Sequence, residues 1–197
     1  MQTDMELFYL RIGGKLTMNL YTSDLHLGHA NVIKFDGRPF ADVDEMDRML
    51  IEMWNAKVRP EDNVYIVGDL CYRNGKPAEW YLKQLSGIKH LVIGNHDRKI
   101  LNDNKAMSYF ESVDKMMHVS DEGNQLCLCH FPIAEWNGFH RGHWLVYGHI
   151  HNRLDDAYHF MKTRERALNA GCMINNYMPA TFKELVRNNQ IFQEQNN

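Results

Sequence analysis

Residues 90–97 read HLVIGNHD, an apolar run that stops at a glycine and is followed by Asn95, His96 and Asp97. A short run rich in β-branched and other apolar residues that ends at Gly is typical of a buried strand. Four other runs share the pattern, so we expect five strands, at Asn19–Ser23, Val64–Val67, His90–Ile93, Gln125–Cys129 and Trp144–Tyr147.

The clearest helix is predicted between the first two of these strands. Asp42 can cap its first turn, Glu45 follows three residues later, and apolar residues recur on one face at positions 43, 46, 50 and 53. Two further helices are expected around Pro77–Leu85 and Ala180–Asn188. The alternation of strands and helices in the first half predicts an α/β domain. Strands follow one another more closely in the second half, which predicts a mixed sheet or a second sheet.

Length, composition and charge fit one ordinary globular domain. The chain has 197 residues, of which 44% are hydrophobic and 24% charged. It carries 22 Lys and Arg against 25 Asp and Glu, a net charge of −3. This mild balance argues against a dedicated binder of long nucleic acid.

The sequence also favours a cytoplasmic protein without membrane contact. No apolar run approaches the roughly 20 residues of a membrane-spanning helix. Acidic residues at positions 4 and 6 interrupt the N-terminus before a secretory signal could form. The four cysteines, at positions 71, 127, 129 and 172, do not resemble a disulfide framework, so we expect reduced thiols.

Each predicted strand is followed by Asp, Asn or His. In α/β sheets the carboxyl ends of strands form the edge where ligands bind. Each of these segments after a strand, taken alone, is more often a simple turn, since Asp, Asn and Gly all favour turns. Five such pieces in order favour a shared site instead, and glycines before three of them permit a close backbone approach. The candidate residues are Asp24, His26, Asp69, Asn95, His96, His130, His149 and His151.

The residue types favour two metal ions. Four imidazoles, two carboxylates and one amide are too many ligands for one ion, whereas two ions about 3.5–4 Å apart with a bridging carboxylate would use them all. Magnesium and calcium prefer oxygen ligands, so this nitrogen-rich set favours Mn, Fe, Zn, Ni or Co, with Mn as our first expectation. Two divalent ions, two aspartates and one hydroxide leave a net charge of +1, which attracts a phosphate.

The ordered set Asp24-x-His26, Gly68-Asp69, Gly94-Asn95-His96-Asp97, His130 and Gly148-His149-x-His151 resembles the calcineurin-like metallophosphoesterase superfamily. The resemblance spans residues 19–151 and points to a small member without a cap domain, of bacterial or phage type. It implies a four-layer α-β-β-α sandwich of two mixed sheets.

The resemblance also implies a role for each residue. One metal would take Asp24, His26, Asp69 and His151, and the other Asp69, Asn95, His130 and His149. His96 would act as general acid while a metal-bridging hydroxide attacks the phosphorus. We expect an open groove that accepts phosphodiesters or small phosphorylated metabolites. A nuclease, a phosphomonoesterase and a non-catalytic, metal-binding interaction module of the same fold are the alternatives.

The segment that contains Asp69 departs from two branches of the superfamily. Residues 68–73 read GDLCYR, where the protein-phosphatase branch has Gly-Asp-x-x-Asp-Arg, so the carboxylate that would orient His96 is missing. Arg73 matches the phosphate-binding arginine of that branch, although an exposed loop arginine is an equal alternative. Tyr72 matches the iron-binding tyrosine of purple acid phosphatases. Because His26 should already fill that position, we expect Tyr72 to pack beside the metals rather than bind them.

Weaker substrate contacts are expected from His29 and Arg38, with solvated loop residues as the alternative for both. Cys127 and Cys129 share one face of a predicted strand, and core packing is the preferred explanation over zinc binding. Residues 1–17 lie outside the family pattern. We hypothesise that Met18 is the natural start and that residues 1–17 are a translated leader or surface appendage, with 18–197 as a single domain. The opposing interpretation is that Leu7, Phe8 and Leu10 pack on the domain or form an extra strand.

Overall fold

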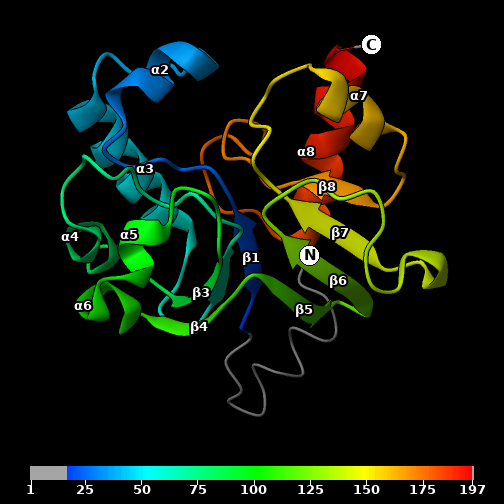
Figure 1. Ribbon diagram of the computed structural model, residues 1–197, viewed down its shortest axis with the longest axis horizontal. Helices are drawn as coiled ribbons and strands as arrows, with labels where there is room; N and C mark the ends of the chain where they lie inside the picture. The colour runs from blue at the N-terminus through cyan, green and yellow to red at the C-terminus, as the bar shows by residue number, and fades with distance from the viewer. Residues whose placement is uncertain (1–16, 197) are drawn as a thin grey trace, which may run out of the picture.

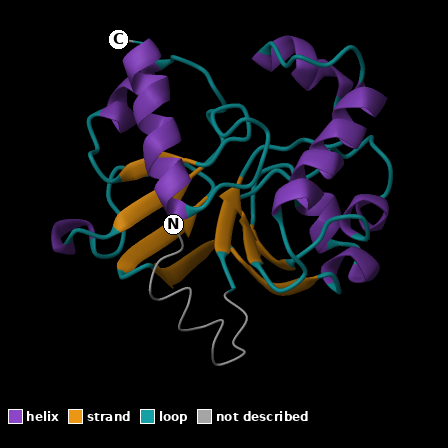
Figure 2. Ribbon diagram, turned by 180° about the vertical axis from the view of Figure 1, so that it is seen from behind, coloured by secondary structure: helices purple, strands orange, loops and turns teal. Residues whose placement is uncertain are grey.

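The computed structural model describes residues 17–196. Two four-stranded sheets lie side by side in the centre, and helices cover the outer side of each (Figures 1 and 2). The four-layer α/β architecture expected from the sequence is therefore confirmed. The leader hypothesis for residues 1–17 falls almost wholly outside the described residues.

The first sheet has the order β1-β2-β3-β4 and is parallel throughout, so the expectation of two mixed sheets is wrong for this sheet. Each connection between its strands carries at least one helix, which returns the chain to the same edge and makes the next strand parallel. Its strands are β1 (Asn19–Thr22), β2 (Asn63–Ile66), β3 (Ile88–Val92) and β4 (Phe110–Asp114). The connecting helices are α2 (Ala30–Asp36), α3 (Val43–Lys57), α4 (Ala78–Leu82), α5 (Arg98–Leu101) and α6 (Asn104–Met107).

The second sheet has the order β5-β6-β7-β8 and is mixed, as expected. β5 and β6 form an antiparallel hairpin whose two loop residues, Glu122 and Gly123, both have positive φ, as a type I′ turn requires. β6, β7 and β8 are parallel. The elements of this half are β5 (Met116–Asp121), β6 (Asn124–Cys129), a 3-10 helix (Phe139–Arg141), β7 (Trp144–Tyr147), α7 (Asp156–Lys162), β8 (Ala167–Asn169) and α8 (Phe182–Gln195).

All five predicted strands are present, with ends shifted by at most two residues. The predicted cap of α3 is also confirmed, because the Asp42 carboxylate accepts a hydrogen bond of 2.9 Å from the Glu45 amide. The last helix begins later than expected, at Phe182. Thr181 and Glu184 form a capping box there, which fixes the start of α8.

Three apolar clusters hold the layers together. The central cluster joins the sheets, with Tyr21 and Val67 from the first half packed against Leu128 and Val146 from the second. A larger cluster lies between the first sheet and α3. The third lies between the second sheet and α7 and contains Cys127 and Cys129, both buried, as the alternation along β6 predicted. Among the described residues, no helix is long and apolar enough to cross a membrane.

Candidate metal centre

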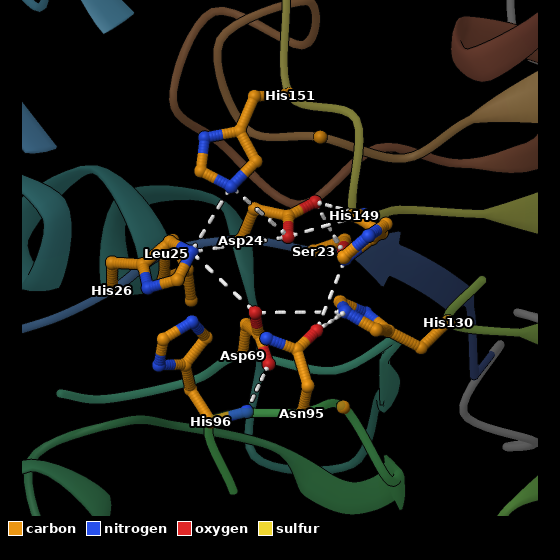
Figure 3. A network of polar contacts seen from close by, with 12 residues as sticks. Ser23, Asp24, Leu25, His26, Asp69, Asn95, His96, His130, His149 and His151 are labelled. Atoms are coloured by element: carbon orange, nitrogen blue, oxygen red, sulfur yellow. Dashed lines mark hydrogen bonds and ion pairs between the residues drawn. The ribbon is translucent and has the colours of Figure 1, made fainter. Parts of the chain in front are cut away.

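The loops that follow the strands of both sheets meet at one edge of the molecule. β1, β2 and β3 are parallel, so their carboxyl ends lie together, and the same holds for β6 and β7. Figure 3 shows the side chains that these loops bring together at the junction of the two sheets. The first sheet delivers Asp24, His26, Asp69, Asn95 and His96, and the second delivers His130, His149 and His151.

One group of possible metal ligands consists of Asp24, His26 and His151. The Nε2 atoms of the two imidazoles are 3.1 Å apart, and His151 Nε2 lies 3.6 Å from Asp24 Oδ1. Two ligand atoms each about 2.1 Å from one ion are separated by roughly 3.0–3.4 Å at octahedral or tetrahedral angles. The separation of the two imidazole nitrogens lies within this range, whereas Asp24 Oδ1 lies 3.6 Å and 4.0 Å from them, somewhat beyond it. The three atoms face a common point, and a small movement of the Asp24 side chain would fit them to one ion.

A second group consists of His130, Asn95 and His149. Asn95 Oδ1 lies 3.0 Å from His130 Nε2 and 3.0 Å from His149 Nδ1. Asp69 lies between the two groups, because its Oδ2 atom is 3.6 Å from His26 Nε2 and 3.5 Å from His130 Nε2. One carboxylate oxygen thus faces a histidine of each group.

Hydrogen bonds outside the two groups fix which ring nitrogens face inward. His130 Nδ1 lies 2.9 Å from the carbonyl oxygen of Val67, which can only accept, so Nδ1 carries the proton of the neutral ring and Nε2 presents a lone pair. His151 Nδ1 faces the Asp36 carboxylate at 2.8 Å in the same way. When the two rings are neutral, both inward Nε2 atoms are acceptors surrounded by carboxylate and amide oxygens. A divalent cation satisfies such a set, so the residues present fit a metal site.

The electrostatics agree with a site built for a cation. Burial lowers the pKa of His26 to about 3, which keeps its ring neutral and able to bind a metal. Burial opposes ionisation of Asp69, but its hydrogen bond to His130 and the positive charge of His130 outweigh this and lower its pKa to about 2. For His130, burial alone would lower the pKa, yet the hydrogen bond with Asp69 and the charges of Asp24 and Asp69 raise it to about 9. A metal ion would displace that proton.

The backbone of the site is strained. Five of the candidate ligands adopt φ values between +49° and +72°, a region that residues other than glycine seldom occupy, and they are Asp24, His26, Asp69, His149 and His151. Such conformations cost of order 1–3 kcal/mol each and cluster at functional sites.

The glycines before Asp69, Asn95 and His149 allow close contact between loops, as the sequence predicted. At Gly94 a side chain would meet Asp69, with the added Cβ only 2.6 Å from the Asp69 backbone nitrogen. At Gly148 it would overlap Ser23, whose hydroxyl donates to Asp24.

We expect Gly94→Ala to separate the loops after β2 and β3 and to lower the free energy of unfolding by about 1–3 kcal/mol, as overpacking does. Metal affinity should fall with it, because Asp69 and Asn95 belong to these two loops. Chemical denaturation and metal titration measure both effects. Gly123→Ala, at a hairpin position with nothing within 4 Å, is the control that should leave metal affinity unchanged.

Arg38, expected to contact substrate, has a structural role instead. Its side chain is fully buried, and its guanidinium donates to the carbonyl oxygens of Leu25 (2.8 Å) and Asp24 (2.9 Å) and to the Asp36 carboxylate. It therefore clamps the loop that carries Asp24 and His26. The sequence analysis missed Asp36, which pairs with Arg38 and also holds His151; the residue precedes a helix-ending glycine and has no spacing that marks it.

Replacing Asp36 by Asn should weaken metal binding about 10–100-fold, because the Asp36 carboxylate orients His151 and increases its basicity. Titration with Mn²⁺ measures the change. Asp44→Asn, at an exposed carboxylate on α3, is the matched control. Equal affinities for the Asp36 and Asp44 variants would contradict this role.

Asp97 does not orient His96. It is fully buried, and its carboxylate accepts hydrogen bonds from the backbone amides of Asp69 (2.9 Å), Leu70 (3.1 Å) and Gly94 (2.8 Å). Asp97 thus ties the loop after β2 to the loop after β3. The His96 backbone amide donates to Asp69 Oδ1 at 2.8 Å, whereas its imidazole has no hydrogen bond to another described residue.

The weaker candidates surround His96. The Tyr72 ring lies against the His29 ring, with centroids 3.8 Å apart, so Tyr72 packs beside the centre as expected. His29 in turn lies 5.8 Å from the ring of His26. Arg73 is exposed and lines a cavity of about 440 Å³ together with Tyr72, Asn95, His96, Arg98, Lys99 and Asn102.

The two sheets pack together, and the carboxyl ends of their strands carry a group of mainly nitrogen acceptors. This arrangement defines an α/β protein with a metal centre. The family model described as calcineurin-like phosphoesterase matches residues 20–188, and the chain belongs to this family. Membership supports a phosphoric ester hydrolase that uses divalent metal ions.

Individual relatives agree with this assignment. The chain is 32% identical over 167 residues to an uncharacterized protein of Methanocaldococcus jannaschii, covering 84% of this chain and 87% of that protein. It is 33% identical over 161 residues to the gene 66 protein of Mycobacterium phage D29, covering 68% and 78% respectively. Among solved structures, a protein of unknown function from Aquifex aeolicus shares the fold with a TM-score of 0.67 at 23% identity, covering 87% of this chain and 99% of that one.

Proposed function

We propose that this protein is a dinuclear-metal phosphodiesterase. The observation that carries the proposal is the position of Asp69, whose Oδ2 atom faces His26 of one ligand group and His130 of the other at nearly equal distances. A bridging carboxylate between two ions needs this arrangement. The nitrogen-rich ligand set favours Mn²⁺ for both positions, with Fe, Zn, Ni or Co as the other candidates.

Bound divalent ions would stabilise the charge on the phosphate oxygens and lower the pKa of a water held between them. The protein supplies the rest. Asp24 and Asp69 hold the positive charge of the site in place, and the backbone strain around them fixes their directions. His96 lies beside His26 at a ring separation of 5.1 Å and opens onto the cavity, so its imidazole can give a proton to the leaving oxygen.

A phosphodiester is the favoured substrate because one general acid beside an open cavity suits a leaving alcohol that needs protonation. Small phosphorylated metabolites fit the same cavity. A monoesterase, a nuclease and a non-catalytic interaction module are the alternatives. The complete ligand set together with His96 favours an enzyme, since a binding module has no need for a proton donor. The four cysteines are buried and free of disulfides, which supports our proposal of a cytoplasmic protein.

The test is reconstitution with Mn²⁺ followed by assays on bis-nitrophenyl and mono-nitrophenyl phosphate. We expect two bound metal ions per chain and a kcat/KM at least tenfold higher for the diester. A preference for the monoester would contradict the phosphodiesterase assignment. Activity no higher than that of the metal-free protein would contradict an enzymatic role.

A further inference from the structure

The cavity beside His96 contains more positive charge than cleavage of one phosphate requires. Its lining includes three cationic side chains, Arg73, Arg98 and Lys99, and no acidic one. None of the three forms an ion pair with another residue between 17 and 196, although the Lys99 ammonium donates to the Arg73 carbonyl oxygen. All three are exposed. Unpaired cations around a concave surface attract an anion.

The place of the cavity indicates which part of a substrate would reach it. Its wall includes Asn95 and His96, so it is continuous with the metal centre. His96 lies on the side of Asp69 away from His130 and His149 (Figure 3). The leaving oxygen is the atom that would receive a proton from His96. The part of the substrate attached to that oxygen would therefore extend into this cavity.

We propose that the cavity is a subsite for a second phosphate group, carried by the leaving-group part of the substrate. This inference rests on the proposed phosphodiesterase function and on His96 as the proton donor. In the reaction, the attacking water gives one proton to solvent as its oxygen forms a bond to phosphorus, the bond from phosphorus to the leaving oxygen breaks, and the His96 proton passes to that oxygen. Arg73, Arg98 and Lys99 would meanwhile hold the second phosphate by charge-assisted hydrogen bonds.

The groove continues past this subsite. A second cavity of about 290 Å³ shares Tyr72, Arg73 and Lys99 with the first and adds Lys76, which is paired with Asp44, and Asp103. Arg73 and Lys99 therefore carry the positive charge from the first cavity toward the second. A short oligonucleotide, which has phosphates at successive positions along its chain, would place its next phosphate beside these two side chains. The net charge of −3 for the whole protein does not reveal this local concentration of cations.

The kinetic test compares the dinucleotide d(TpT) with d(pTpT) and d(TpTp) on the Mn²⁺-loaded protein. One of the two terminal phosphates belongs to the leaving nucleoside, whichever P–O bond breaks. We expect that compound to be cleaved with a kcat/KM about tenfold above that of d(TpT), which corresponds to about 1.4 kcal/mol. In an Arg98→Gln/Lys99→Gln variant this advantage should fall below twofold. Lys115→Gln, an exposed lysine outside the cavity, should keep it.

A binding test separates the subsite from the catalytic proposal. The Mn²⁺-loaded protein is titrated calorimetrically with thymidine 3′,5′-bisphosphate and with thymidine 5′-monophosphate. If the bisphosphate binds wild type more tightly than the monophosphate does, and the double variant loses this difference, the subsite is supported. This holds even if no diester is cleaved, because the absence of cleavage would overturn only the proposed function. Diester cleavage that is equal for all three dinucleotides, with identical titrations for wild type and variant, would overturn the subsite.

Discussion

An Asp69→Asn variant should lose at least about a thousandfold in kcat/KM for bis-nitrophenyl phosphate, equivalent to about 4 kcal/mol of transition-state stabilisation. The substitution keeps the shape of the side chain and removes its negative charge. Asp69 faces histidines of both ligand groups, so the loss of its charge weakens both ion sites together. Metal content should fall below two ions per chain, as measured by elemental analysis after dialysis.

Asp44→Asn provides the matched control for this result. The Asp44 side chain is 81% exposed and, within residues 17–196, pairs with Lys76 alone, so its substitution should change activity less than twofold. Circular dichroism would show whether both variants keep their folded structure. An Asp69→Asn protein with two bound metals and activity within tenfold of wild type would show that Asp69 does not bridge the ions.

A His96→Gln variant should show a loss of activity that depends on the leaving group. General acid catalysis contributes about 10²–10⁴-fold when the leaving oxygen needs a proton. We therefore expect a loss of that size for d(TpT), whose leaving group is an alcohol. Nitrophenolate departs as a stable anion, so the loss for the nitrophenyl ester of thymidine 5′-monophosphate should be less than tenfold.

Metal content decides between this role and a structural one. The His96 imidazole makes no hydrogen bond to the ligand groups within residues 17–196, so the variant should bind metal as wild type does. His140→Gln, at an exposed loop histidine in the 3-10 helix, should behave as wild type with both substrates. An equal loss for both leaving groups would rule out His96 as the proton donor.

Much of the site could be predicted from the sequence because its residues follow the ends of strands. An apolar run that stops at Gly-Asp or Gly-Asn marks both a strand and the loop after it, and parallel strands then place such loops together. Strands β4, β5 and β8 were not predicted for a related reason. β4 and β5 are mostly exposed and lack the continuous apolar run, and β8 has only three residues.

The residues that support the ligands could not be predicted in the same way. Asp36 contacts His151 across 115 positions of the chain, and nothing local marks Asp36 as different from any other aspartate at the end of a helix. Asp97 follows His96 directly in sequence, yet its carboxylate turns away to bind three backbone amides. Arg38 shows the opposite case, since an arginine in a loop is usually exposed while this one is buried among carbonyl oxygens. Such contacts depend on how the loops pack.

The distribution of the ligands over the two sheets links metal binding to folding. The ligand group of Asp24, His26 and His151 combines loops of the first and the second sheet, and so does the pair of Asn95 and His130. Each ion of the proposed centre would therefore act as a cross-link between the two halves of the molecule, in addition to the apolar cluster and the hydrogen bonds that already join them. By mass action, free metal at a thousand times its dissociation constant adds about 4.1 kcal/mol per site to the folded state. Metal supply in the cell would thus govern how long the protein persists as well as how fast it works.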